Sequence, residues 1–120
     1  MTIAREVMAA GGGSGLSAAV RGSYSLTVTA AGVAAATATA LTTSLNVITT
    51  CTEAACGVIL PANDIGDSIT VINATANNAR VYPPTGGAFN GGTANVPVTL
   101  GANKGTTFFQ TGTANYGTEI

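Results

Sequence analysis

The sequence predicts an all-β fold, a small antiparallel β-sandwich or barrel that begins near residue 23. Apolar residues alternate with Ser, Thr and Asn along short runs, which is typical of strands with one buried face. The intervals between these runs are rich in Gly, Pro and Asn, which favour turns. Short strands separated by such turns at near-regular spacing indicate a sandwich or a barrel.

The first 22 residues differ from the rest of the chain. Ile3, Val7 and Met8 would line one face of a short helix, and the three glycines at 11–13 would then end it. We therefore expect an N-terminal arm with a glycine hinge over residues 1–22, followed by one β-domain over residues 23–120. A disordered terminus is the alternative interpretation of the arm.

The first two predicted strands flank a tract of small residues. In "SYSLTVT" (23–29) the apolar residues fall on one face, and in "LTTSLNVI" (41–48) Leu41, Leu45 and Val47 do the same. The intervening tract "AAGVAAATATA" (30–40) allows a helix or a strand. We predict a strand, because alternating Ala and Thr suit a strand that packs close to another backbone.

Three further runs alternate in the same way: "DSITVIN" (67–73), "NVPVTL" (95–100) and "TTFFQTG" (106–112). Pro97 lacks a backbone N–H, which predicts that its strand lies at a sheet edge or carries a bulge. One face of each run should contribute to the core. The residues that we expect to be buried within the chain are Val47, Ile69, Val71, Val96, Val98 and Phe108.

Charged residues are few, with four basic and five acidic side chains, no histidine and a net charge of −1. A nucleic-acid surface needs grouped Lys and Arg, which the sequence lacks. No run has the length and apolarity of a transmembrane helix or a signal peptide. Without histidine the usual general base near neutral pH is missing. We therefore expect no enzymatic activity, no cofactor, and neither nucleic acid nor a membrane as a partner.

Two local motifs suggest ligands but have simpler explanations. Asp64 and Asp67 could face one cation, yet calcium takes about six to eight oxygens and this loop offers few, so we predict turn capping and no metal site. "GGGSG" (11–15) lacks the Gly-Lys-Ser/Thr of a phosphate loop and is interpreted as a linker. Asn73 begins a glycosylation pattern, which we interpret as an asparagine that ends a strand.

The two cysteines, Cys51 and Cys56, bracket the four residues "TEAA". A structural zinc site needs about four ligands, which two thiols supply only if three copies pool them on an axis. The remaining alternatives are a local disulfide and two free thiols. In a hairpin turn the two Cα atoms would lie within the ~4.4–6.8 Å that a disulfide requires. We predict the disulfide, although a reducing cytoplasm would oppose it.

The composition also suggests an oligomer. Leu, Ile, Val and Phe contribute only 26 of the 120 residues, and many of the other apolar residues are alanine. Burial is worth roughly 25 cal/mol per Å² of apolar surface, so small side chains give a thin core. A partner that covers more surface would stabilise such a chain, and we expect an obligate homotrimer.

The middle and the end of the sequence resemble a family of phage proteins. "ALTTSLNVITTC" and the stretch from "GVILPANDIGDSITVINA" to "TTFFQTGTANY" are similar to a β-module of tailed-phage structural proteins. The module occurs in capsid decoration (cement) proteins and in distal parts of tail fibres and spikes. The resemblance covers roughly residues 37–118. It depends on Leu60-Pro61, "GDSITVINA", "VYPP" (81–84), the turn at 89–92, Phe108, Phe109 and Tyr116.

The resemblance implies a homotrimeric virion protein that reinforces the outer capsid surface, with the major capsid protein as its partner and no active site. Under this interpretation the arm residues Ile3, Val7 and Met8 would contact the capsid or a sister subunit. Candidate subunit contacts are Leu41, Leu45, Tyr82 and Phe109. The alternative is a receptor-binding tip of a tail fibre or tailspike, whose loops would bind a host surface glycan.

Overall fold

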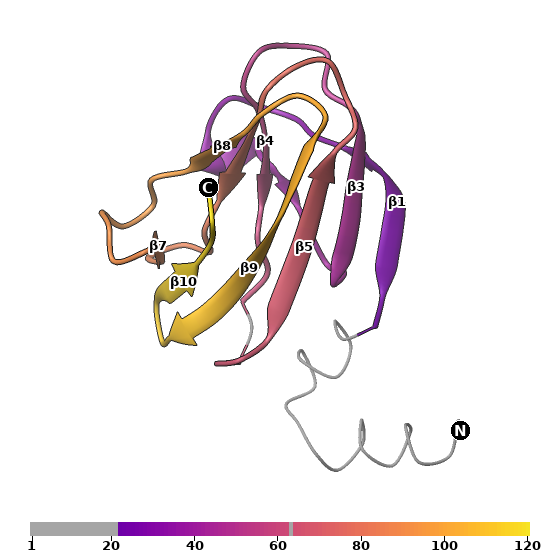
Figure 1. Cartoon of the computed structure of the whole chain (residues 1–120). Coiled ribbons are helices and arrows are strands. Elements are labelled where there is room, and N and C mark those ends of the chain that lie inside the picture. The colour runs from indigo at the N-terminus through magenta and orange to yellow at the C-terminus, as the bar shows by residue number, and fades with distance from the viewer. Residues whose placement is uncertain (1–21, 63) are drawn as a thin grey trace, which may run out of the picture.

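The chain folds as a β-solenoid of about four turns, here called coils (Figure 1). The computed structural model describes residues 22–62 and 64–120, in which nearly all regular structure is β-strand. The all-β prediction is confirmed, whereas the predicted antiparallel sandwich or barrel is wrong. The arm residues Ile3, Val7 and Met8 lie outside the described residues.

The strands form two sheets. Sheet A has the strand order β1-β3-β5-β9-β10-β7, and sheet B has the order β2-β4-β6-β8. The elements of the described residues are β1 (Tyr24–Thr29), η1 (Ala35–Thr37, a 3-10 helix), β2 (Thr39–Ala40), β3 (Leu45–Thr50), β4 (Cys56–Ile59), β5 (Ser68–Asn73), β6 (Ala79–Tyr82), β7 (Ala88–Phe89), β8 (Val98–Leu100), β9 (Lys104–Gly112) and β10 (Asn115–Gly117).

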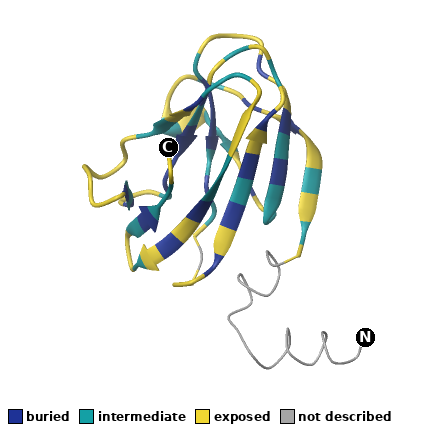
Figure 2. Ribbon diagram, in the orientation of Figure 1, coloured by how far each residue is buried: buried dark blue, intermediate teal, exposed yellow. Residues whose placement is uncertain are grey.

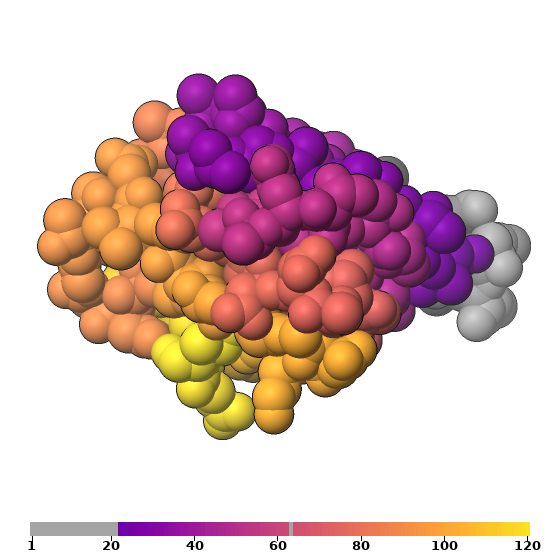
Figure 3. Space-filling view, turned by 90° about the horizontal axis from the view of Figure 1, so that it is seen from above, coloured from indigo at the N-terminus to yellow at the C-terminus, as the bar shows by residue number. Residues whose placement is uncertain are grey.

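The first three coils run in the same direction. The chain alternates between the sheets, so β1, β3 and β5 pair in parallel in sheet A, and β2, β4 and β6 pair in parallel in sheet B. Tyr24, Leu45 and Thr70 therefore occupy equivalent positions in successive coils. Figure 3 shows this stacking as a progression of colour across the molecule, from indigo through magenta to orange.

The last coil runs in the opposite direction. β8 pairs antiparallel with β6, and β9 pairs antiparallel with β5. β10 then pairs antiparallel with β9, and β7 pairs in parallel with the other edge of β10. β8 is one of the two edge strands of sheet B, and Pro97 immediately precedes it, which agrees with the edge position predicted from this proline.

The core lies between the two sheets, and Figure 2 shows the resulting alternation of buried and exposed residues along the strands. Of the six residues expected to be buried, Ile69, Val71 and Phe108 are, while Val98 is half-buried against the core. Two expectations are wrong: Val47 is only half-buried and Val96 is 51% exposed. In β3 the inward residues are Asn46 and Ile48, so Val47 points outward.

The tract from residue 30 to 40 is a strand only at its end. Thr39 and Ala40 form β2, and Ala31 makes an isolated bridge to Gly57. Between them the chain bends through η1. The prediction of a strand over the whole tract is therefore wrong, although the small residues do lie against a neighbouring backbone, as the bridge shows.

Candidate interaction surface

The outer face of sheet A carries a row of apolar side chains. Leu45 and Val47 lie on this face because their neighbours Asn46 and Ile48 are buried. The strand register places Leu45 beside Tyr24 and Val47 beside Ile72. Side chains directly opposite each other in neighbouring strands are about 4.5–5.5 Å apart at Cβ, so these residues form a continuous surface.

We call this surface the outer apolar patch. Tyr24 is 68% exposed, Leu26 51% and Ile72 37%, and Phe109, which follows the buried Phe108 in β9, is 48% exposed. β1, β3 and β5 contain no charged residue. Soluble monomers rarely expose contiguous apolar patches of more than a few hundred Å². The patch consists of Tyr24, Leu26, Leu45, Val47, Ile72 and Phe109, of which Phe109 is separated from the others by Ser68 and Thr70.

A shallow open pocket lies at the β1 side of the patch. It has a volume of about 420 Å³, and its lining includes Tyr24, Leu26 and Leu45. Ser44 fixes the rim, since its Oγ donates to the carbonyl oxygen of Ser23 at 2.8 Å and its N–H donates to Ser23 Oγ at 3.2 Å. The pocket is therefore apolar at its centre, with hydroxyl groups at one side.

The open edge of sheet A adjoins the same patch. β1 has six residues and pairs on one side only, with β3, within the part of the chain that the structure describes. At the other end of the solenoid the edge strands are short, with two residues in β7 and three in β8. Long edge strands without charge or proline offer backbone groups to a further strand, and short ones do so much less.

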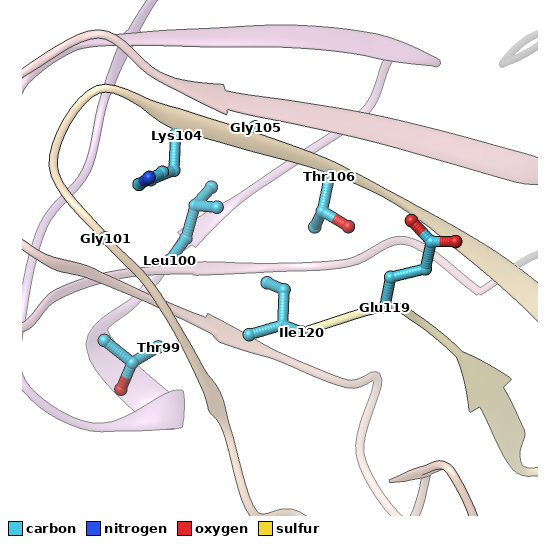
Figure 4. Close-up of a pocket in the computed structure, with 8 residues that line it drawn as sticks. All are labelled: Thr99, Leu100, Gly101, Lys104, Gly105, Thr106, Glu119 and Ile120. Carbon is cyan, nitrogen blue, oxygen red and sulfur yellow. The ribbon is translucent and has the colours of Figure 1, made fainter.

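A second pocket lies at the opposite end of the solenoid (Figure 4). It has a volume of about 290 Å³ and is lined by parts of β8 and β9, the turn between them and the last two residues. Figure 4 shows Leu100 and Ile120 close together at its centre, with Lys104 and Glu119 on different sides. This arrangement offers one positive and one negative group to a ligand. The hydroxyl of Thr106 lies between them and is already hydrogen-bonded to the hydroxyl of Thr118, with 3.2 Å between the oxygens.

The predicted cysteine pair forms a disulfide in the structure. Cys51 and Cys56 are both buried, and their Cα atoms are 5.8 Å apart. The bond links the residue that follows β3 to the first residue of β4, across a turn in which Ala55 has a φ of 67°. The disulfide thus fixes the passage of the second coil from sheet A to sheet B.

The four candidate contact residues separate into two groups. Leu41 and Tyr82 are 3% and 5% exposed, so they pack within the chain and have little surface left for a neighbour. Leu45 and Phe109 lie in the outer apolar patch. Sequence reasoning did not include Tyr24, Leu26, Val47 and Ile72 among the contact residues, although the alternation in β1 and β5 was visible.

The Asp64–Asp67 loop is a turn in the structure. The N–H of Asp67 donates to the carbonyl oxygen of Asp64 at 3.0 Å, and Asp67 Oδ2 accepts from the N–H of Asp64 at 3.3 Å. Gly66 has a φ of 92°, a conformation that favours glycine. These contacts agree with the interpretation of the aspartates as turn-capping residues. Within the described ranges, no group of three or more His, Cys, Asp or Glu is placed to hold a metal ion.

Asn73 ends β5 and is completely buried, so it is not available for glycosylation in the folded chain. Its Nδ2 donates to the carbonyl oxygens of Asn77, Leu100 and Gly101, and its Oδ1 accepts from the N–H and the hydroxyl of Thr75. One side chain thereby joins the turn after β5 to the turn before β9. The asparagine-rich run "NATANN" was the sequence signal for this corner.

The chain matches no model of a known protein family, and no curated protein matches it in sequence. The resemblance to phage decoration proteins therefore remains a prediction. None of the helical segments that the structure describes has the length and apolarity needed to cross a membrane.

Proposed function

We propose that this chain is a virion structural protein, a trimeric cement protein that binds the outer surface of a phage capsid. Its partner would be the major capsid protein, and the chain would act through surface contacts and catalyse no reaction. The observation that carries the proposal is the outer apolar patch, because a protein that acts alone would leave these side chains in water.

The construction of the body also supports a reinforcing role. Each inner coil is hydrogen-bonded to a coil on either side, the disulfide holds one passage between the sheets, and Asn73 links two turns. These features make local opening costly along much of the chain. A protein that stabilises a capsid must itself resist deformation when the capsid is under stress.

A trimer suits both the chain and the proposed partner. Obligate interfaces commonly bury about 2,000 Å² or more, which would supplement the thin core. A three-fold assembly also fits the local three-fold positions of an icosahedral shell, where it would hold three neighbouring capsid subunits. The shell is stabilised only if the trimer binds its assembled form better than its separate subunits.

The direct test is the number of copies of this chain in purified particles, measured by quantitative mass spectrometry against the major capsid protein. A cement protein should be present at a fixed high ratio to the capsid subunits. Addition of the recombinant chain to undecorated capsids should then raise the temperature at which they disrupt. Absence from the particles, or no binding to undecorated capsids, would contradict the proposal.

The alternative, a receptor-binding tip of a tail fibre or tailspike, is favoured by one observation. The open pocket combines the exposed ring of Tyr24 with the serine hydroxyls of Ser23 and Ser44, and glycans are held by such combinations of aromatic and polar groups. A tail component would be present in only a few copies per particle. The same copy-number measurement therefore separates the two functions.

A further inference from the structure

We infer that the outer apolar patch is the surface through which copies of this chain contact one another, with β1 nearest to the symmetry axis. The inference depends on the trimer proposed above and identifies its contact face. A patch that packs against the same patch on other subunits must lie beside the axis, because equivalent residues come together only there.

The continuity of the patch is the first argument. Tyr24 and Leu45 are register partners, as are Val47 and Ile72. Leu26 lies with Tyr24 and Leu45 around the open pocket. Apolar side chains thus extend from the free edge of sheet A across three neighbouring strands without an intervening charge.

Charge is the second argument, and it favours a copy of this chain over a different partner. At a three-fold axis every side chain meets two identical ones, so a charged residue there would face two like charges. Of the strands that carry the patch, β1, β3 and β5 have no charged residue, and the one charged residue of β9, Lys104, begins that strand five residues before Phe109. The six charged side chains of the described ranges all lie elsewhere: Glu53, Asp64, Asp67, Arg80, Lys104 and Glu119. Because the patch has no charge for a different partner to complement, a second copy of the same uncharged surface is the occupant that it fits.

The polar groups within the patch can also be covered at low cost. Thr70 pairs with Leu45 on one side and with Thr107 of β9 on the other, and the hydroxyl oxygens of the two threonines are 3.0 Å apart, joined by one hydrogen bond in which either can be the donor. Polar groups that are already hydrogen-bonded lose little when water is removed. The threonines can therefore be buried together with their apolar neighbours.

The area of the patch is consistent with the centre of an interface. Aromatic side chains bury roughly 200 Å² each when fully covered. With 68% of Tyr24 and 48% of Phe109 exposed, these two rings alone leave about 230 Å² in water. A standard interface buries about 800 Å² per partner, with an apolar centre and a more polar rim. The aliphatic residues of the patch and the surrounding Ser and Thr would supply the rest.

The test compares Leu26→Asp with Val96→Asp. Both positions are 51% exposed, but Val96 lies in the segment between β7 and β8, far from β1 (Figure 1). Sedimentation equilibrium should show trimers for the wild-type chain and Val96→Asp. In Leu26→Asp three carboxylates would meet at the axis, and we expect assembly to weaken on the order of 100-fold or more.

A second pair of variants covers the case in which Leu26→Asp fails to fold. The two native cysteines are bonded to each other, so Leu26→Cys would carry the chain's single free thiol. A short bismaleimide should link two subunits of Leu26→Cys, whereas Val96→Cys should remain uncrosslinked under the same conditions.

The outcomes separate this inference from the proposed function. A Leu26→Asp trimer as stable as wild type, together with no crosslinking of Leu26→Cys, would overturn the inference and leave the trimer intact. A Leu26→Asp trimer that no longer binds capsids would also overturn it, because the patch would then face the shell. A wild-type chain that stays monomeric at high micromolar concentration would contradict the proposed trimer itself.

Discussion

Tyr82 lies with its ring against Gly57, so closely that a β-carbon on the glycine would be 2.9 Å from the ring carbon Cε2. The hydroxyl of Tyr82 donates to the carbonyl oxygen of Val33 at 3.2 Å, and the same β-carbon would be 3.3 Å from Cβ of Ala38. The ring therefore holds the tract of residues 30–40 against the outer face of sheet B. Only a residue without a side chain fits beneath it.

Gly57→Ala should lower the free energy of unfolding by about 1–3 kcal/mol, because overpacking displaces a ring that is held at both ends. Urea unfolding measures the loss. Gly112→Ala is the matched control in a strand, since the nearest atom to its β-carbon would be 3.7 Å away. In a Tyr82→Ala background the same Gly57→Ala change should cost much less. An equal cost in both backgrounds would show that the ring is not the obstacle.

Asn73→Asp should destabilise the chain by about 3 kcal/mol near neutral pH, because it places a carboxylate where the amide now donates to three carbonyl oxygens. Chemical denaturation measures this loss. Asn103→Asp, at an exposed position of the nearby turn, serves as the control and should have little effect. If Asn73→Asp were as stable as the wild type, the hydrogen bonds of Asn73 would not be important for joining the two turns.

Removal of the disulfide should cost about 2 kcal/mol by the loop-entropy estimate, as the closed loop is short. The variant is Cys51→Ala with Cys56→Ala, measured by thermal unfolding without reductant. Peptide mass mapping under non-reducing conditions establishes independently whether the bond forms in the purified protein. Two freely alkylated thiols in the wild-type chain would refute this prediction.

Burial raises the pKa of Tyr116 above the usual value of 10.0. Its ring packs edge-on against Phe89, with centroids 6.3 Å apart. Since the fold favours the neutral phenol, this stability is fully present below pH 10 and is lost as the pH rises through the pKa of the folded chain. Unfolding in urea at pH 8 and pH 10.5 should therefore show a decline that is smaller in Tyr116→Phe. If the free energy of unfolding fell equally in both proteins, ionisation of groups other than Tyr116 would be responsible for the decline.

Strand positions were accessible from the sequence, but strand pairing was not. The runs that contain β1, β3, β5 and β9 were all predicted as strands. Alternation shows that a strand has one buried face, but it does not determine which strands pair with it. β4 and β6 are adjacent in sheet B even though β5 lies between them in the sequence, because the chain crosses to sheet A and back. The short turns suggested hairpins, which led to the wrong antiparallel sandwich.

Two local irregularities also reversed the predicted faces. In β1 the pairing register shifts between Ser25 and Val28, so Val28 is buried while Tyr24 and Leu26 are exposed. In β3 the buried face includes Asn46, whose Oδ1 accepts a hydrogen bond from the hydroxyl of Thr43. A pattern that assigns only apolar residues to the interior selects the wrong face in such a strand. The same reversals produced the outer apolar patch, which explains why the sequence indicated only part of it.

The reversed last coil has a consequence for how far copies can accumulate. Endless filaments require that each end of a subunit accept the next one. Here one end presents the six-residue strand β1, whereas the other ends in β7 and β8, which have only two and three residues, and β8 runs antiparallel to β6. Such a subunit has one end with a long edge strand and one end with short edge strands. If copies assemble through β1 as proposed, the short edge strands at the other end offer little for a further copy to pair with, and growth into a fibre is disfavoured.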